Sequence, residues 1–515
     1  MYFVREKLAL KNSSIAFICQ IFDIFLQFFI RKLFIMYIGI EILGVNSTVS
    51  SILAALSVAE LGFEAAIIYS LYKPIAQNNK NEVEDIVIIL KKIYTYVGVF
   101  ILLAGLIILP FLPNILNGID LNTSIYVAYY IQVMGVAVTY FLGYKRTLLF
   151  ALKRDYIRNI YISTYKLIAA VIQVLIMIIA PSYIGYVLVI FAQNLFTNIS
   201  IARYCDRNFD YNLKGKKFNK KYFQKIFSDV KNIFWSKIAG YIYASTDALV
   251  LAISVGVTSV GYLSNYTQIF IQLKSLLNNA LNSNKPIIGD LLTHTTNREH
   301  TLKILHKYTF VRYVGASIFI IPAVTLIDSF ITIWLSSQYI LPLYITILIA
   351  MELFITIVHG ALVDYIGGLG YFSQDKKIAI VGAVLNLILS IWLVNIYGVA
   401  GVLIGTLISQ LFFWVTRSLI VFRNYYKVRT YFIEYWLRQF SYILVFITSL
   451  LLSMYMYRYL PFGNSYLKFS VGGLLSIILI ILINTLVFHR YEEYKYTKSL
   501  LVKIINKVIK KDKNK

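Results

Sequence analysis

Long apolar runs recur along the whole chain, and they constrain its fold more than any other feature. The first extends from Ser13 to Gly39, and runs of about 20 residues are long enough for a helix to cross the hydrocarbon of a bilayer. A segment in hydrocarbon must satisfy its backbone hydrogen bonds internally, which favours α-helices. Hydrophobic residues make up 59% of the 515 residues and charged residues only 14%. The sequence therefore predicts an all-α, polytopic membrane protein.

The hydropathy pattern predicts fourteen membrane-spanning helices. Lysine and arginine gather in the segments after the even-numbered spans, most strongly in R-N-F-D-Y-N-L-K-G-K-K-F-N-K-K-Y-F-Q-K after span 6. The segments after the odd-numbered spans lack both residue types, except near Arg458 and Lys468. Because basic segments stay on the cytoplasmic side, both termini are expected to be cytoplasmic. The expected spans are residues 13–38, 43–70, 86–109, 122–144, 160–180, 183–203, 232–254, 258–282, 308–330, 339–365, 377–396, 398–420, 437–457 and 466–488.

The connecting segments argue against an enzyme. The predicted outer segments are short, and no phosphate-binding loop of the form G-x-x-x-x-G-K-[ST] occurs. The five histidines are scattered, and Cys19 lies far from Cys205, so we expect no metal site, no disulfide and no cofactor. The net charge of +25 comes mostly from the basic inner segments and the tail. It points to anionic phospholipids as partners, in preference to nucleic acid.

An internal repeat underlies the fourteen spans. The run G-I-E-I-L-G-V-N-S-T-V-S-S-I, from Gly39, matches G-V-T-S-V-G-Y-L-S-N-Y-T-Q-I, from Gly256, at an offset of 217 residues. A second match, between runs that begin at Ile184 and Ala400, has an offset of 216. Two parallel six-helix repeats with a site between them follow from this pattern. The expected parts are a six-helix lobe (1–205), a basic amphipathic cytoplasmic linker (206–231), a second six-helix lobe (232–424), helices 13 and 14 (425–490) and a basic cytoplasmic tail (491–515).

Polar residues form stripes on the predicted spans. On span 1, four of them share an arc of about 80° at 3.6 residues per turn: Gln20, Asp23, Gln27 and Arg31. On span 2, an arc of similar width holds Asn46, Ser50, Ser57, Glu60 and Glu64. Spans 5, 7 and 9 add Lys166, Asp247 and Arg312. A charged side chain at the bilayer centre costs roughly 2.5–3.5 kcal/mol, so a stripe through a span favours a hydrated cavity.

A second interpretation of these residues stays open. Polar side chains in a membrane also join helices, by hydrogen bonds that contribute roughly 0.6 kcal/mol each. Lys166 and Arg312 could also extend toward the cytoplasmic surface while their methylene groups stay in the apolar region. The middle of span 1 favours the cavity for Asp23 and Arg31.

Two stretches resemble the polysaccharide repeat-unit flippases of the multidrug/oligosaccharidyl-lipid/polysaccharide exporter superfamily. Residues 43–83 contain A-E-L-G-F-E-A-A-I-I-Y-S-L-Y-K-P, and residues 245–269 contain T-D-A-L-V-L followed by V-G-Y-L-S-N-Y. In the second stretch, Ala248 stands where this family often has asparagine. The resemblance also covers the number of spans, the order of the loops and the basic inner loops.

The resemblance implies transfer of undecaprenyl-diphosphate-linked oligosaccharides from the inner to the outer leaflet of a bacterial cytoplasmic membrane, by alternating access. This transfer would serve capsule, exopolysaccharide or O-antigen synthesis. A monomer is expected, and a polysaccharide polymerase is a further candidate partner. Such flippases have a central cavity with cationic residues; by position Arg31 is the first candidate, followed by Lys166 and Arg312. The planar guanidinium of arginine can bind two diphosphate oxygens at once.

Three other functions compete with this one. A cation-coupled multidrug exporter of the same superfamily would use acidic cavity residues. Five acidic residues leave that function open: Asp23, Glu60, Glu64, Asp247 and Glu352. A flippase for lipid-linked peptidoglycan precursors would look similar. A membrane polymerase or glycosyltransferase would be expected to have a substantial catalytic loop, and none is visible.

Overall fold

The computed structural model describes residues 2–57, 63–209, 211, 246–281, 285–295, 297–462 and 465–512. These residues are helical almost throughout, and no strand occurs among them. Ten helices in these ranges are long and apolar enough to cross a membrane, and they coincide with predicted spans 3–6 and 9–14. The prediction of an all-α, polytopic membrane protein is confirmed, whereas the count of fourteen spans stays a prediction.

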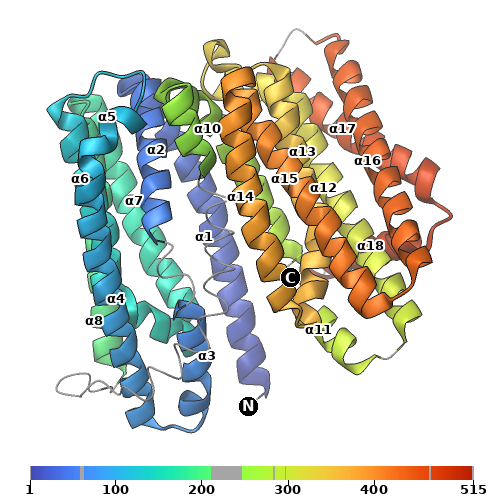
Figure 1. Ribbon diagram of the computed structural model, residues 1–515, viewed down its shortest axis with the longest axis horizontal. Helices are drawn as coiled ribbons and strands as arrows, with labels where there is room; N and C mark the ends of the chain where they lie inside the picture. Colours follow the sequence, from blue (N-terminus) through green and yellow to red (C-terminus); the bar gives the residue numbers. More distant parts are fainter. Residues whose placement is uncertain are drawn as a thin grey trace. The chain divides into compact units, whose positions relative to one another are not determined.

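Residue contacts divide the chain into two units, Met1–Ser264 and Asn265–Lys515. In the first unit, α4 packs against α6, α6 against α8, and α7 against both α1 and α8 (Figure 1). Its elements are α1 (Tyr2–Tyr37), α2 (Ile40–Leu56), α3 (Phe63–Ala76), α4 (Lys80–Ile108), η2 (Leu109–Phe111), α5 (Leu112–Ile115), α6 (Thr123–Ala151), α7 (Asp155–Ile179), α8 (Tyr183–Asn208), the helical residues 246–254 and the start of α10 (Val257–Leu281).

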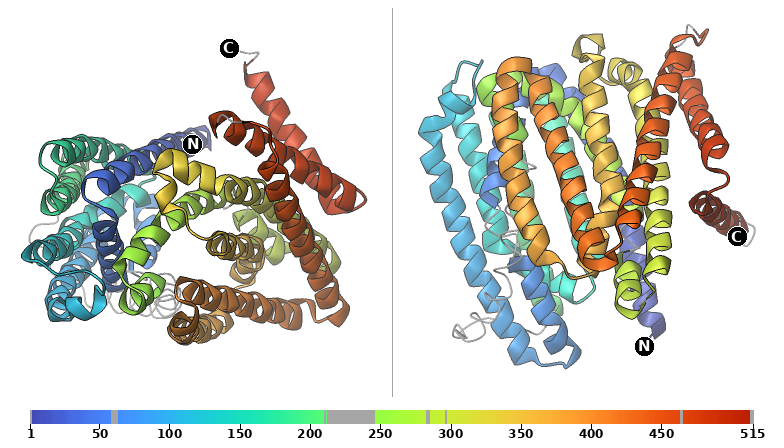
Figure 2. Two further views of the ribbon diagram at one scale, coloured as in Figure 1. Left: turned by 90° about the horizontal axis from the view of Figure 1, so that it is seen from above. Right: turned by 45° about the vertical axis from the view of Figure 1, so that its right-hand side comes forward.

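The second unit contains the rest of α10 and ten further elements. Helix α13 lies at its centre, in contact with α11, α12 and α15, and α14 runs beside α15 (Figure 2). These elements are α11 (Lys285–His294), α12 (Arg298–Trp334), η4 (Ser337–Tyr339), α13 (Leu343–Gly368), α14 (Phe372–Tyr397), α15 (Val399–Val421), η5 (Phe422–Tyr426), α16 (Arg429–Arg458), α17 (Ser465–Phe488) and α18 (Glu492–Asp512). The domain boundaries expected from the sequence stay a prediction.

The order of helices supports the predicted repeat. In the first unit a helix of 17 residues, α2, is followed by a short helix, α3, and then by the long helices α4, α6, α7 and α8. From α10 onward the same order recurs, with the 10-residue helix α11 in the place of α3 and α12–α15 in the places of the long helices. The packing of α4 on α6 and of α6 on α8 recurs as α12 on α13 and α13 on α15.

Predicted span 2, residues 43–70, contains most of α2 and the first part of α3, with undescribed residues between them. Helix α2 ends at Leu56 and α3 begins at Phe63, and residues 58–62 lie outside the described ranges. At the end of α2 the Ser57 hydroxyl donates to the carbonyl of Leu53, 2.8 Å away. Serine side chains that bond to nearby backbone groups in this way compete with regular helix. Of the arc expected for span 2, Asn46 and Ser50 lie in α2 and Ser57 lies at its end, and the arc as a whole stays a prediction.

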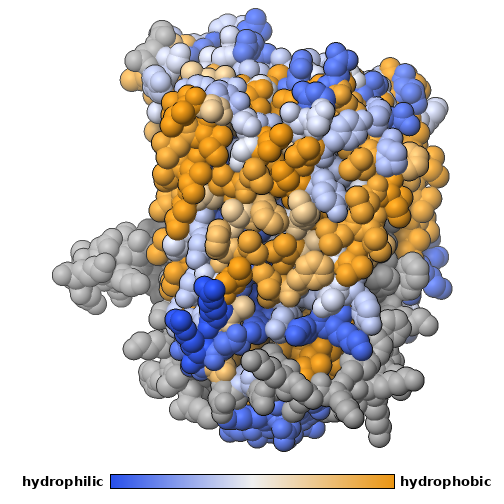
Figure 3. All heavy atoms as spheres, turned by 90° about the vertical axis from the view of Figure 1, so that its left-hand side faces the viewer, coloured by the Kyte–Doolittle hydropathy of each residue, from blue (hydrophilic) through white to orange (hydrophobic). Residues whose placement is uncertain are grey.

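Apolar side chains cover the outward faces of the long helices. On α7 they include Leu167, Ile168, Val171, Ile172, Leu175 and Ile178, all of them exposed. Figure 3 shows one face of the molecule, on which apolar side chains form a broad expanse between more hydrophilic ends. A soluble protein rarely exposes apolar surface on this scale, whereas lipid chains solvate it.

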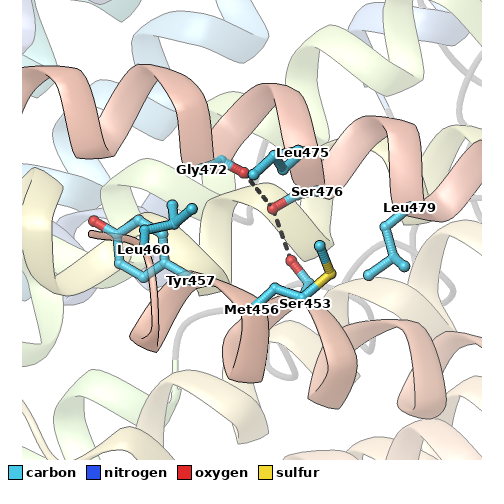
Figure 4. A pocket seen from close by; sticks show the side chains of 8 residues that line it. All are labelled: Ser453, Met456, Tyr457, Leu460, Gly472, Leu475, Ser476 and Leu479. Carbon is cyan, nitrogen blue, oxygen red and sulfur yellow. Dashed lines mark hydrogen bonds between the residues drawn. The ribbon is translucent and has the colours of Figure 1, made fainter. Parts of the chain in front are cut away.

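Hydroxyl groups join the last two long helices to α12. Ser453 of α16 donates to Ser476 of α17 across 2.7 Å, and Ser476 donates to the carbonyl of Gly472 across the same distance (Figure 4). Thr325 of α12 lies 2.9 Å from the Ser453 hydroxyl. Small residues that let helices approach and hydroxyls that bond between them are typical of helix packing in membranes. Helices α16 and α17, outside the repeat, are fixed to α12 in this way.

Candidate functional site

Asp23, in the polar stripe of α1, forms an ion pair with α7. Its Oδ2 atom lies 2.5 Å from Nζ of Lys166, and the two side chains are 19% and 33% exposed. Asp23 and Arg31 are eight residues apart, which is about 12 Å along a helix, so they do not pair with each other. The other carboxylate oxygen, Oδ1, is buried and has no hydrogen-bond partner among the described residues. Two of the predicted site residues therefore neutralise each other.

Arg31, two turns further along α1, has a neutral partner. Its Nη2 donates to the hydroxyl of Ser264 in α10 across 2.5 Å, and this hydroxyl donates to the carbonyl of Gly261 across 2.8 Å. The Nε atom of Arg31 is buried and has no hydrogen-bond partner in the part of the chain that the structure describes. No carboxylate there pairs with Arg31 either. No carboxylate of the described residues therefore neutralises the guanidinium.

Amide and phenol groups surround the next turn of α1. The hydroxyl of Tyr183 accepts a hydrogen bond from Nε2 of Gln132, 2.9 Å away, and donates to Oδ1 of Asn46, 3.4 Å away. The ring of Phe34 meets the rings of Tyr183 and Tyr186 edge-on. Gln132 and Tyr183 are absent from the predicted site, because each is a single polar residue in an apolar run and forms no stripe.

A close crossing of α2 and α10 positions Ser264. A Cβ atom added at Gly44 would collide with the carbonyl of Val257, and one added at Gly261 would collide with the carbonyl of Ile40. The two glycines at the preceding turns, Gly39 and Gly256, have φ angles of 106° and 117°, which favour glycine. The two copies of the repeated glycine motif thus contact each other directly.

Arg312 has a different environment, inside the second unit. Its Nη2 lies 2.5 Å from Oδ2 of Asp364, and the two side chains are only 3% and 4% exposed. It also donates to the Tyr308 hydroxyl and to the carbonyl of Ile357, at 2.7 and 3.0 Å. Lys285 Nζ lies 3.5 Å from the same aspartate. These contacts are those of a buried ion pair, although Nε of Arg312, like Nε of Arg31, is buried and has no hydrogen-bond partner among the described residues. The proposed place of Arg312 in a cavity stays a prediction.

The remaining predicted residues are distributed as follows. Gln27 is exposed and Gln20 is partly buried, both on α1. Asp247 lies in the helical residues 246–254 and is partly buried. Glu60 lies outside the described residues, and Glu64 lies in α3, where its side chain is not described. Among the described residues, no group of histidine, cysteine and carboxylate side chains could hold a metal ion.

Comparison with known families decides where the chain belongs. A sequence model of the family described as "Polysaccharide biosynthesis protein" matches residues 9–292, more than half of the chain. The chain is a member of this family. The matched range contains every predicted site residue except Arg312. No curated protein sequence matches the chain.

Solved structures of exporters share the fold of this family member. "Lipid II flippase MurJ, inward closed conformation" superposes with a TM-score of 0.68 at 12% identity, over 93% of this chain and 98% of that chain. An inward-facing multidrug resistance MATE family transporter of the MOP superfamily gives 0.64 at 12% identity, over 80% and 98%. A mutant of the Vibrio cholerae MATE transporter VcmN gives 0.54 at 11% identity, over 83% and 99%. The chain therefore shares its fold with these three proteins.

Proposed function

We propose that the protein is a flippase that moves undecaprenyl-diphosphate-linked oligosaccharides from the inner to the outer leaflet of a bacterial cytoplasmic membrane. One observation carries the proposal: Arg31, in the polar stripe of α1, has a hydroxyl partner and no carboxylate partner among the described residues. An arginine in hydrocarbon is costly unless it meets an anion. A diphosphate supplies that anion.

The chemistry of the cargo suits the groups around Arg31. The lipid tail can stay in the bilayer, while the diphosphate and the glycan need polar contacts. A guanidinium binds two phosphate oxygens through parallel hydrogen bonds. Tyr183, Gln132 and Asn46 offer hydroxyl and amide groups of the kind that bind sugar hydroxyls. The family description supports a glycan as the cargo.

The Asp23–Lys166 pair argues against a cationic drug as the main cargo. A cation that binds Asp23 would have to displace the Lys166 ammonium, 2.5 Å away. The opposite charge pattern, a free carboxylate and a paired arginine, would favour a multidrug exporter. Arg31 alone does not distinguish a capsule precursor from a peptidoglycan precursor, since both carry a diphosphate.

The test is the display of surface glycan in cells that depend on this protein. Arg31→Ala should abolish display, and Arg31→Lys should keep part of it because the charge remains and the planar fork is lost. Lys32→Ala is the matched control, because Lys32 is the adjacent cation on the same helix and is exposed. Each variant is compared at equal protein level in the membrane.

The outcomes separate the competing functions. Normal display with Arg31→Ala at a normal protein level would refute the proposal. Cells that lyse on depletion of the protein, instead of losing only surface polysaccharide, would favour a peptidoglycan precursor as the cargo. Loss of the protein itself would mean that Arg31 holds α1 to α10 and has no part in binding.

A further inference from the structure

We propose that Ser264 is a positioning residue, which holds the Arg31 guanidinium ready for an anionic headgroup without neutralising it. This inference rests on the proposed function. It concerns a residue of α10 that lies 233 positions from Arg31 in the sequence.

The hydrogen bonds run in one direction from the cation to the backbone. Nη2 of Arg31 donates a hydrogen bond to the Ser264 hydroxyl at 2.5 Å. The hydroxyl in turn donates a hydrogen bond to the Gly261 carbonyl at 2.8 Å. Because the hydroxyl proton is committed to this carbonyl, a lone pair of the oxygen faces Arg31. The serine therefore acts as an acceptor of fixed orientation.

The backbone around Ser264 is itself held in place. Ser264 lies three residues after Gly261, so it shares the face of α10 that meets α2. At Gly261 there is no room for a Cβ atom against the Ile40 carbonyl, and at Gly44 there is none against the Val257 carbonyl. In addition, the Val257 amide donates to the Asn117 carbonyl across 3.0 Å. The position of the Ser264 hydroxyl is thus fixed by contacts on two sides of the first turns of α10.

The type of residue matters as much as its position. An aspartate at this place would orient the guanidinium equally well, but it would also cancel the charge, as Asp364 does for Arg312. A hydroxyl leaves the charge intact. Arginine has five N–H donors, and the structure leaves the buried Nε of Arg31 without a partner among the described residues. The arrangement fits a cation that is held in place through one N–H donor and uses its other N–H donors to bind a ligand.

Binding to the purified, full-length protein tests this role. The probe is farnesyl diphosphate in detergent, measured by titration calorimetry, with farnesol as the uncharged comparison and Arg31→Ala as the reference for lost binding. Ser264→Ala should weaken binding about three- to tenfold, because the guanidinium is no longer pre-organised. Ser264→Thr keeps the hydroxyl and should bind as the natural protein does. Ser264→Asp should bind as weakly as Arg31→Ala.

A purely structural serine predicts a different order. In that case Ser264→Ala and Ser264→Asp would change the melting temperature. The binding affinity of the variants would then vary with their stability and not with the charge at position 264. Thr95→Ala is the matched control, since Thr95 is exposed on α4 and its hydroxyl bonds only to its own helix, at Lys91. If Ser264→Ala fails to fold, Ser264→Thr and Ser264→Asp decide the question between them.

The results distinguish this inference from the proposed function. Tight binding by Ser264→Asp, or unchanged binding by a folded Ser264→Ala, overturns the positioning role while a loss in Arg31→Ala still supports the flippase. Unchanged binding by Arg31→Ala overturns both.

Discussion

At the scale of single residues, two arginines show how the environment sets a role. Arg312 and Arg31 both lie in predicted spans, but Arg312 fills the space above Gly360 and pairs with Asp364, whereas Arg31 meets a serine. A buried charge that has lost its partner strongly destabilises a protein. An intact buried ion pair contributes little net stability, because the cost of desolvation offsets the attraction. The Arg312–Asp364 pair therefore suits a structural role. Arg31, beside a serine, suits a charge that binds another molecule.

Removal of either member of the Arg312–Asp364 pair should therefore destabilise the protein. Asp364→Ala is expected to cost about 3–5 kcal/mol, because it leaves the Arg312 charge buried without a carboxylate partner. Arg312→Ala should cost less, because Lys285 Nζ still lies 3.5 Å from Asp364. Thermal unfolding of the purified protein measures the loss. The matched control is Arg417→Ala, whose partner Asp375 is more exposed, at 17% against 4% for Asp364. An equal or larger loss in the control would contradict the argument from burial.

The Asp23–Lys166 pair should show coupling in a double-mutant cycle. Residues in one salt bridge are coupled by about 0.5–3 kcal/mol, so Asp23→Ala and Lys166→Ala together should cost less than the sum of the two. Asp23→Ala with Arg31→Ala is the matched cycle, because these residues are about 12 Å apart along α1 and should be additive. Additive changes for Asp23 and Lys166 would mean that the ion pair contributes nothing to stability.

The sequence predicts the stripe of α1 and misses its partners. Periodicity is a local property, so four residues on one face follow from their spacing. Lys166 lies 143 positions from Asp23, and Ser264 lies 233 positions from Arg31. Such contacts depend on how α7 and α10 pack, and the spacing of residues within α1 carries no information about that packing.

At the scale of helices, the crossing of α2 and α10 predicts a sharp dependence on side-chain size. Gly44→Ala and Gly261→Ala should each destabilise the protein by about 1–3 kcal/mol, since the added methyl group would overlap a backbone carbonyl. Gly289→Ala is the matched control, because a Cβ there meets nothing within 4 Å in α11. Since alanine favours a helix over glycine, the control should be neutral or stabilising. Melting temperatures of the three variants decide the point.

The tail helix should assist placement in the membrane and take no part in transport. Helix α18 runs from Glu492 to Asp512, within the basic tail expected from the sequence. At its start Glu493 pairs with Arg438, which also bonds to Glu434 of α16. Truncation after Lys495 keeps this contact and removes lysines that each contribute roughly 1 kcal/mol near an anionic surface. Glycan display should survive; its loss from a correctly inserted protein would refute this role.

The polar residues of the candidate site lie on helices that the hydropathy pattern itself predicts as spans. The pattern predicts spans over residues 13–38, 43–70 and 258–282, where the structure has α1, α2 and α10. Helix α2, with 17 residues, is apolar but shorter than the ten candidates. These helices contain the polar stripe of α1, Asn46 and Ser264. Where a membrane protein needs polar groups, its sequence departs from the apolar pattern, and these residues are such departures within otherwise apolar runs.

At the scale of the whole molecule, the topology makes a prediction that labelling can test. Single cysteines at Asn219 and Asn514, both outside the described residues, should be protected from an impermeant reagent in intact cells. A cysteine at the exposed Asp120, in a predicted outer segment, should be labelled. The background lacks Cys19 and Cys205. Labelling at Asn219 or Asn514 would overturn the fourteen-span topology.

The repeat is the part of the architecture that the sequence predicts over the longest range. Two short matches are enough because they share almost one offset, and the order of helices from α10 to α15 agrees with them.

The contact between the two glycine motifs has a consequence for ancestry. Ile40 and Val257, like Gly44 and Gly261, are 217 residues apart, so each motif gives the other the contact that it receives. Two separate, identical chains could form the same contact, but every side chain near it would then occur in two copies. At the same offset, Arg31 corresponds to Ala248 and Ser264 to Ser47. When both copies lie in one gene, their sequences can diverge. The symmetric contact between the two glycine motifs can then lie beside a single arginine, which binds a single headgroup.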